Sequence, residues 1–212
     1  AASAVSKIPS RGLLPDGSVT ALARALGKGH QLAMGTGDGR VIPVTVEFTQ
    51  GFQGNERSIA PSVTVGTPMA AAPTPQLITK MAYQRTDSDV RIAALLQDQH
   101  LWLTMSRNTS RPDGTAAAST TQVDLTPNIP GRVTAITLAG LAELLAVGTD
   151  EGKVYHFDLR EPAKPSLVDT TQASEGSHAI TALGYLMSDR SLVVGDASGQ
   201  IAVWMPVREH AA

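Results

Sequence analysis

The 212-residue chain contains no cysteine. This absence excludes a disulfide framework, thiolate zinc sites and cysteine nucleophiles. It leaves the compartment open, because cytosolic proteins and extracytoplasmic domains can both do without thiols. Hydrophobic residues make up 42% of the chain and charged residues 17%, which is typical of a folded protein rather than a disordered or fibrous one.

An excess of one charge is missing as well. The 17 basic and 19 acidic side chains give a net charge of −2, and no basic tract is present. Nucleic-acid binding requires a positive surface that neutralises phosphates, so no nucleic-acid partner is expected. The chain also lacks a run of the roughly 20 apolar residues that cross a bilayer, and its first residues lack the apolar core of a signal peptide. The sequence as given predicts a soluble chain that would reach a membrane only through flanking segments.

A repeated hairpin is the strongest pattern in the sequence. The stretch 144–159, LLAVGTDEGKVYHFDL, returns as LVVGDASGQIAVWMP at 192–206. The two stretches align at a constant offset of 47 residues, which relates Gly148 to Gly195 and Gly152 to Gly199. Valine at Gly148 or Gly195 should overpack the fold, because both residues end apolar strands beside a tight turn.

The repeat extends to four modules. Each begins with an apolar-Thr-x-apolar segment, found at 19–22, 78–81, 133–136 and 180–183. The four threonines are therefore in register and predict a repeated hydroxyl hydrogen bond on the innermost strands. They are Thr20, Thr79, Thr134 and Thr181. The second module, with 92–103 as its hairpin, has lost both glycines but keeps a strand, a short polar turn and a strand.

Each of the first three modules contains four extended segments, the fourth being 57–65, 119–125 and 164–170. The second segments, LAMG, LLAVG and LVVG, are almost continuously apolar, which is typical of strands covered on both faces. Four strands at a period of about 40–50 residues indicate the blade of a β-propeller. We therefore expect an all-β fold: one propeller domain over 1–212, with blades at about 18–66, 77–125, 132–171 and 179–207.

The modules resemble the WD-repeat family. The third module has a strand, a glycine-containing turn and a further strand that ends in the aromatic-Asp pair Phe157–Asp158. The last module has Trp204 at the position that corresponds to Phe157. The family's structural aspartate has candidates near three of the turns, in Asp38, Asp150 and Asp196. The Gly-His pair of the family is reduced to His178, so only the fourth module offers the His, Asp and Trp together.

No catalytic, cofactor-binding or metal-binding residue is predicted, and no ligand-binding residue is assigned. The glycine cluster at 35–40 leads into a strand rather than a helix, so it predicts a hairpin turn and not a phosphate cradle. The five histidines show no metal-ligand spacing within one element; they are His30, His100, His156, His178 and His210. His156 and Asp158 share one strand face, but no third group for a site is apparent.

Three further patterns have structural interpretations that we favour over functional ones. Trp102, Phe157 and Trp204 follow the repeat, which predicts packing between blades rather than a binding stripe. The turn aspartates are more typical of solvated or capping groups than of a calcium site. Asn108–Ser110 is a formal glycosylation sequon, relevant only in a secreted eukaryotic protein.

A second resemblance concerns the segment 46–68. It is similar to the propeller-like insert of bacterial phosphate-type ABC transporter permeases, in which a V-x-F strand precedes R-x-I-x-P. The matching residues are Val46, Phe48, Arg57, Ile59 and Pro61. The resemblance implies an extracytoplasmic domain on the periplasmic side of the inner membrane, acting in interaction or regulation beside the rest of a permease, without catalysis or a cofactor.

The alternative is a WD-like scaffold in a multiprotein complex of the cytoplasm. An enzyme is disfavoured because the predicted innermost strands, VTAL, ITKM, VTAI and ITAL, contain no carboxylate. Both remaining hypotheses imply protein partners.

Ring closure is the last question that the sequence raises. Propellers close with about four to eight blades, so four modules are either a small ring or half of a larger one. The last module ends at its third strand, and 3–8 is a candidate closing strand. We expect an incomplete ring that is either part of a larger propeller or completed by association through its open faces, with a homodimer as one such arrangement, since soluble proteins avoid long apolar edges.

Overall fold

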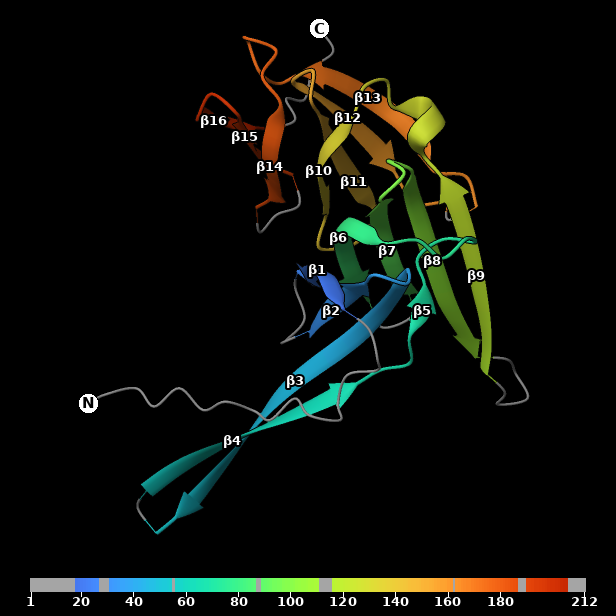
Figure 1. Cartoon of the computed structure of the whole chain (residues 1–212). Helices are drawn as coiled ribbons and strands as arrows, with labels where there is room; N and C mark the ends of the chain where they lie inside the picture. Colours follow the sequence, from blue (N-terminus) through green and yellow to red (C-terminus); the bar gives the residue numbers. More distant parts are fainter. Residues whose placement is uncertain are drawn as a thin grey trace, which may run out of the picture.

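Antiparallel strands, joined mostly by tight turns, form four sheets arranged as the blades of a β-propeller (Figure 1). The computed structural model describes residues 18–26, 31–54, 56–86, 89–110, 116–161, 163–186 and 190–205. The all-β fold and the four blades that the repeat predicts are confirmed. The candidate closing strand at 3–8 lies outside the described residues.

The blades follow one another along the chain. Blade 1 contains β1 (Val19–Arg24), β2 (Gln31–Thr36), β3 (Arg40–Gln53) and β4 (Glu56–Val65), with the short β5 (Met69–Ala70) beside β3. Blade 2 contains β6 (Ile78–Arg85), β7 (Asp89–Leu96), β8 (Leu101–Ser110) and β9 (Ala116–Asp124). A single 3-10 turn, η1 (Thr126–Asn128), leads to blade 3, which contains β10 (Val133–Leu138), β11 (Leu144–Thr149), β12 (Lys153–Asp158) and β13 (Ser166–Gln172). Blade 4 contains β14 (Ile180–Tyr185), β15 (Leu192–Asp196) and β16 (Ile201–Trp204), and so has three strands within the described residues.

The turn between the second and third strands has the same backbone conformation in all four blades. Gly39, Gly152 and Gly199 have φ angles of 79°, 75° and 88°, in the left-handed region that glycine adopts without strain. Blade 2 keeps this conformation although it has lost the glycine, with Gln99 at φ 70°. The hairpins are thus built alike even where the sequence signal has decayed.

The threonine series makes the predicted repeated hydrogen bond. Each threonine lies at a β-bulge of the inner strand, and its hydroxyl donates to a carbonyl on the second strand. The bonds are Thr20 to Gly35 at 3.3 Å, Thr79 to Leu95 at 3.0 Å, Thr134 to Gly148 at 3.2 Å and Thr181 to Gly195 at 3.2 Å. They are structural bonds that repeat with the fold.

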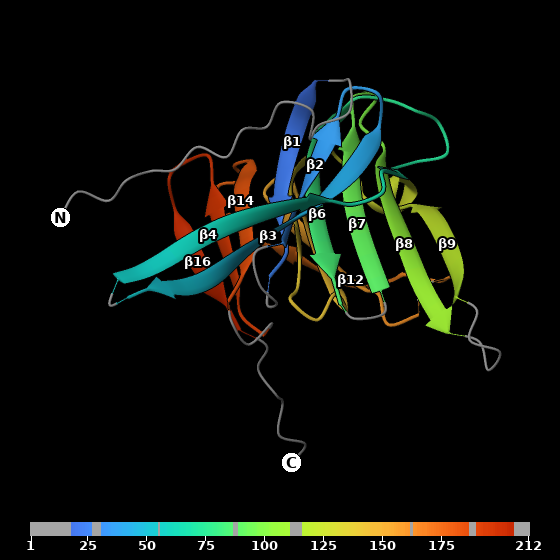
Figure 2. The same cartoon turned by 90° about the horizontal axis from the view of Figure 1, so that it is seen from below.

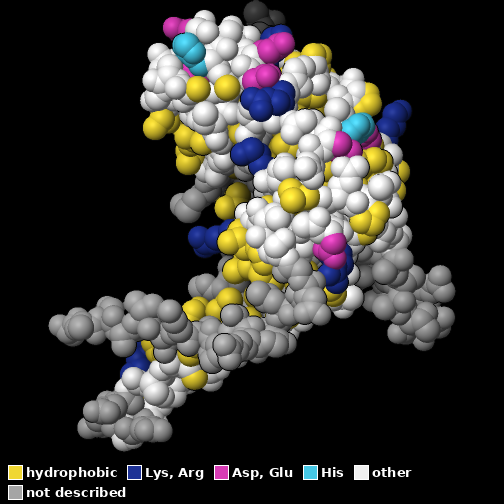
Figure 3. All heavy atoms as spheres, viewed as in Figure 1, with side chains coloured by type: hydrophobic (Ala, Val, Ile, Leu, Met, Phe, Trp, Pro, Cys, Tyr) yellow, Lys and Arg dark blue, Asp and Glu magenta, His cyan; other side chains and the backbone are white. Residues whose placement is uncertain are grey.

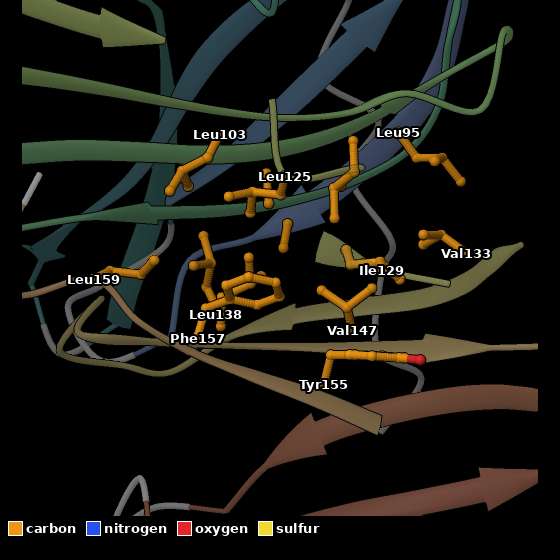
Figure 4. Close-up of a cluster of buried hydrophobic side chains, with 14 of the residues drawn as sticks. Leu95, Leu103, Leu125, Ile129, Val133, Leu138, Val147, Tyr155, Phe157 and Leu159 are labelled. Carbon is orange, nitrogen blue, oxygen red and sulfur yellow. The ribbon is translucent and has the colours of Figure 1, made fainter. Parts of the chain in front are cut away.

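Apolar clusters fill the spaces between consecutive blades. The largest lies between blades 2 and 3, where Leu103 and Phe157 are fully buried (Figure 4). A second cluster, containing Val41 and Ile78, joins blades 1 and 2, and a third, containing Val154 and Ile180, joins blades 3 and 4. The inner strands pack in chain order, β1 against β6, β6 against β10 and β10 against β14. β1 and β14 are the inner strands at the two ends of this row, and they make no comparable contact with each other.

Two buried polar side chains of blade 2 hold both of its neighbours. The amide of Gln84 accepts a hydrogen bond from the N–H of Leu26 at 2.8 Å and donates to the carbonyls of Leu26 and Gly140. The guanidinium of Arg91 donates to the carbonyl of Leu159 at 2.9 Å and to that of Ala142. Blade 2 is therefore tied to blade 1 and blade 3 by hydrogen bonds as well as by apolar packing.

Candidate functional site

The face of each blade that points toward the next blade can be compared position by position. The first residue or two of the third strand supply an aliphatic side chain in all four blades. Val41, Leu101 and Val154 are at most 1% exposed, whereas Ile201 of blade 4 is 78% exposed. The same kind of residue is therefore buried in three blades and left in solvent in the fourth.

The opposite faces show the same asymmetry at the residue before each threonine. Ile78, Val133 and Ile180 are buried against the preceding blade, but Val19 of blade 1, which has no preceding blade among the described residues, is 41% exposed. Leu22, which corresponds to the buried Met81, is exposed too. Blade 1 thus presents along β1 the apolar side chains that later blades bury.

Glycines form the hollow into which these side chains fit. A Cβ added to Gly148 would lie 2.5 Å from Cγ2 of Ile180, and one added to Gly35 would lie 3.1 Å from Cγ2 of Ile78. At Gly195 the nearest atom would be the Cβ of Ala182 at 3.5 Å, in the same blade. The hollow at Gly195 is present, but no described residue of another blade enters it.

Not all of the blade 1 face is exposed. Met34, Ile42 and Val44, further out on the same face, are buried in a cluster whose described members all come from blade 1. The exposed part of this face is therefore its inner strand. Figure 3 shows hydrophobic side chains around the hollow between blade 4 and blade 1.

A long β-ribbon extends from the outer edge of blade 1. β2 pairs with β3 only as far as Thr45, whereas β3 and β4 remain paired from Val44↔Val65 to Gln53↔Glu56. Residues 46–54 and 56–63, here called the arm, therefore form a two-stranded ribbon beyond the blade (Figures 1 and 2). The register places Phe48, Phe52 and Ile59 on one face of the arm, and their exposed fractions are 50%, 73% and 55%.

The five residues that carry the permease resemblance all lie on the arm. Phe48 and Ile59 belong to its apolar face, and Pro61 pairs with Phe48 across the ribbon. The described geometry assigns these residues to an exposed hairpin and brings no cluster of basic side chains to them.

The inner strands of all four blades line a hollow of about 310 Å³ at the centre of the arc. Its walls carry Thr79, Thr134 and Thr181 together with Leu22, Met81 and Leu183. Among the described residues that line it, Lys80 is charged and none carries a carboxylate.

His156 and Asp158, which the sequence places on one strand face without predicting a site, have different surroundings in β12. Burial lowers the pKa of His156, with Asp169 acting in the opposite direction. Asp158 instead pairs with the guanidinium of Arg160, which holds the pKa of the carboxyl at about 2. The two side chains have different partners, and no metal-binding group of three His, Cys, Asp or Glu occurs within the described ranges.

A histidine–carboxylate pair that the sequence analysis did not single out lies in blade 2. Nδ1 of His100 is 2.7 Å from Oδ2 of Asp124, which raises the pKa of His100. Trp102 and Gln76 lie beside this pair around a shallow hollow of about 150 Å³. The residues are 24 positions apart and meet only because β8 pairs with β9, so spacing along the chain gave no signal.

The three turn aspartates do not occupy equivalent positions. Oδ1 of Asp150 accepts the N–H of Arg132 at 2.9 Å, while Asp38 pairs with Arg40 at 2.6 Å. Asp196 accepts the hydroxyl of Ser174 at 2.6 Å and that of Ser198, which holds its pKa at about 2. The three turns therefore use three different hydrogen-bonding arrangements, and the prediction that a WD-type network is not general here agrees with them.

In blade 4 the network runs through a serine. The hydroxyl of Ser174 accepts the backbone N–H of His178 at 3.1 Å and donates to Asp196. His178 and Asp196 are thus linked, but by the histidine backbone rather than its ring.

The remaining predicted residues have structural roles or lie outside the described part. Phe157 is buried between blades and Trp102 packs against the cluster of blades 1 and 2, as the repeat predicts. Trp204 is 40% exposed, so the prediction of inter-blade packing is wrong there; β16 is the last strand of blade 4 among the described residues. Asn108–Ser110 belongs to β8, and His30 and His210 lie outside the described residues.

No helix in the described part of the chain is long and apolar enough to span a membrane.

Comparisons with known proteins support the fold. No family model and no curated protein matches the chain. Among solved structures, the β-propeller domain of Cps50 (Swd1) from Myceliophteria thermophila is 17% identical, with a TM-score of 0.53 over 92% of this chain and 54% of that one. Chaetomium thermophilum Sqt1, solved with the N-terminus of ribosomal protein L10 bound, is 18% identical, with a TM-score of 0.50 over 91% of this chain and 48% of that one.

The chain therefore has a WD-repeat-like β-propeller fold and spans about half the length of each of these structures. Neither of the two proteins is described as a transporter, so they add no support to the permease resemblance.

Proposed function

We propose that this chain is a non-catalytic propeller module that binds a protein partner through the apolar face of the arm. The observation that carries the proposal is the exposure of Phe48, Phe52 and Ile59 on one face of a ribbon that leaves the propeller. Exposed apolar patches on soluble proteins are typical of interaction sites. Aromatic side chains are also enriched among the residues that dominate binding energy at protein interfaces.

The construction of the arm favours a bound state. Beyond Thr45, each strand of the arm has one neighbouring strand among the described residues, and an isolated two-stranded ribbon is marginally stable in water. Beyond Thr45, the side of β3 that β2 pairs with in the blade is free of β2, and its backbone groups can pair with an added strand. A partner that covers the apolar face would bury its exposed side chains, and a partner that adds a strand to the ribbon would pair with the backbone groups of this edge.

A protein fits the arm better than a lipid surface or a nucleic acid. Residues 46–63 contain one basic residue, Arg57, and two acidic residues, Glu47 and Glu56. Membrane-surface segments and nucleic-acid sites are usually rich in Lys and Arg. The structural likeness to Sqt1, which was solved with a ribosomal protein segment bound, supports a protein-binding role by analogy of fold.

The test compares capture by three baits from extracts of the source organism. The parent chain, a Phe48→Ser/Phe52→Ser variant and the control Thr49→Ala, on the opposite face of the arm, are compared by quantitative mass spectrometry. The proposal expects at least one protein to fall more than tenfold with the double variant and to remain with Thr49→Ala. Equal capture by all three baits, with unchanged circular dichroism, would contradict it.

The finer hypotheses on setting stay predictions. A permease insert on the periplasmic side requires apolar segments of about 20 residues on both sides of this chain in its gene. A free WD-like scaffold of the cytoplasm requires their absence. The gene sequence around the chain distinguishes the two, and the scaffold agrees better with the structural neighbours.

A further inference from the structure

The backbone groups of the arm point to its two edges in a fixed alternation. The N–H of Gly66 donates to the carbonyl of Pro43 at 2.8 Å, which makes this pair a hydrogen-bonded one. Hydrogen-bonded and non-hydrogen-bonded pairs alternate along an antiparallel ribbon, so the even-numbered residues of β3 form non-hydrogen-bonded pairs with β4. The N–H and C=O groups of Gln50 and Phe52 therefore point away from β4, toward the edge that β2 leaves at Thr45.

The other edge of the arm, along β4, is interrupted by a proline. Pro61 pairs with Phe48, so by the same alternation its nitrogen faces outward, and this nitrogen carries no hydrogen. Proline in an exposed strand is one of the features by which proteins prevent an edge from pairing with another chain. The stretch 46–54 of β3 and its turn contains no proline. Of the two edges, the one along β3 is therefore the edge that can accept another strand.

The edge of β3 is complementary to itself. Two antiparallel copies centred on Gln50 place Phe48 of each copy opposite Phe52 of the other, and Glu47, the one charged residue of 46–54, opposite an uncharged residue. Aromatic pairs directly across two strands stabilise a sheet, whereas like charges in that position destabilise it. This register also uses the whole edge, because Gln50 is the middle residue of 46–54. Registers centred two residues to either side would leave nearly half of the edge unpaired.

We propose that a second copy of this chain pairs with the edge of β3, so that two arms form one four-stranded antiparallel sheet in the order β4-β3-β3-β4. The contact is isologous, with its twofold axis at Gln50. Pro61 limits the assembly to two copies, because both outer edges of the joined sheet are the interrupted ones. The edge arises because β3 continues past the start of β2 and not because a neighbouring blade is missing, and its self-complementary register selects a second copy over an unrelated strand.

The joined sheet keeps the apolar face of the arm accessible. Residues paired across neighbouring strands share a face, so Phe48, Phe52 and Ile59 of both copies lie on the same face of the sheet. A partner bound there would meet an apolar surface of twice the extent. The contact between the copies uses the backbone groups of the edge, so this proposal does not rest on the proposed function.

Sedimentation equilibrium at micromolar concentration tests the contact with two matched proline variants. The parent chain should sediment at twice its mass of 22.1 kDa. Gln50→Pro removes an N–H at the centre of the contact that the pairing of β3 with β4 does not use, and it should raise the dissociation constant of the dimer more than tenfold. Ile59→Pro makes the same change at the outward-facing position directly across the ribbon and should remain dimeric. Gln50→Ala keeps the N–H and should remain dimeric as well.

A single cysteine gives an independent readout, because the chain has none of its own. Hydrogen-bonded antiparallel pairs have Cα atoms about 5.5 Å apart, which a disulfide can bridge. Mild oxidation should therefore convert Gln50→Cys to a covalent dimer and should cross-link Ile59→Cys far less. A parent chain that sediments at 22.1 kDa, a dimer that Gln50→Pro weakens no more than Ile59→Pro does, or equal cross-linking of the two cysteine variants would overturn the proposal.

Discussion

Blades 3 and 4 carry related residues on the face that points toward the next blade. In blade 3 this face is buried against blade 4, whereas in blade 4 it is exposed among the described residues. Val154 is buried while Ile201 is 78% exposed, and the hollow at Gly148 is filled while that at Gly195 is not. The inner hydrogen bond is the same in both, from Thr134 and from Thr181. The repeat therefore specifies a surface, and only the presence of a following blade turns that surface into a core.

Valine substitutions of the glycines on the two faces should give the largest difference in the free energy of unfolding. In Gly148→Val the added side chain would overlap Ile180, and we expect the free energy of unfolding to fall by about 3 kcal/mol. Gly195→Val should change the unfolding of the single chain by no more than about 0.5 kcal/mol, because only its own blade is near. Urea denaturation at concentrations where the chain is monomeric measures both values, and equal losses would remove the distinction between the faces.

A second prediction concerns the polar connections of blade 2. Gln84→Ala removes three hydrogen bonds and leaves backbone groups of Leu26 and Gly140 without that partner. We expect a loss of about 2 kcal/mol in the free energy of unfolding. Lys80→Ala, near the exposed end of the same strand, is the control and should be nearly neutral; a comparable loss in the control would mean that the connection is not specific.

The aliphatic positions give a smaller contrast. Val154→Ala removes two buried methyl groups and should cost about 1.5 kcal/mol in the free energy of unfolding. Ile201→Ala should leave the stability of the single chain within about 0.5 kcal/mol. Thermal denaturation of dilute samples checks the pair, and a large effect at Ile201 would show that blade 4 is covered within one chain.

The smallest effect concerns the turns. His100 has a raised pKa because of its hydrogen bond to Asp124, so the stability from this contact is complete below the unfolded-state pKa near 6.5 and is lost as pH rises through the higher folded value. Asp196 in blade 4, with its pKa at about 2, should stay charged over the same range. NMR titration should show the pKa of His100 falling toward its ordinary value in Asp124→Asn. An unchanged pKa in that variant would show that the contact does not form in solution.

The periodic features of this fold could be predicted from the sequence. The apolar-Thr-x-apolar segments and the glycine turns placed the inner strands and hairpins correctly, even in blade 2, where Gln99 replaces glycine. These features are local, and each blade repeats them. The strong destabilisation expected from the sequence for valine at Gly195 is the exception, because the nearest described atoms there belong to the same blade and favour a smaller effect. A repeat carries no information about which copy lacks a neighbour.

Features that occur once could not be found in this way. The arm depends on the pairing of β3 continuing past the end of β2, and the link between His100 and Asp124 depends on the register of β8 and β9. The buried roles of Gln84 and Arg91 arise from backbone carbonyls of neighbouring blades, which no side-chain motif reveals. Two aromatic residues in a polar segment, Phe48 and Phe52, are the feature of the sequence that could have indicated the arm.

A cysteine-labelling experiment tests this comparison most directly, because the chain has no cysteine of its own. Val154→Cys and Ile201→Cys each place one thiol on the face that points toward the next blade. A thiol reagent under native conditions should modify the exposed position 201 rapidly and the buried position 154 only as the chain unfolds. Equal protection of the two thiols would contradict the account, because it would mean that the faces of blades 3 and 4 are covered alike.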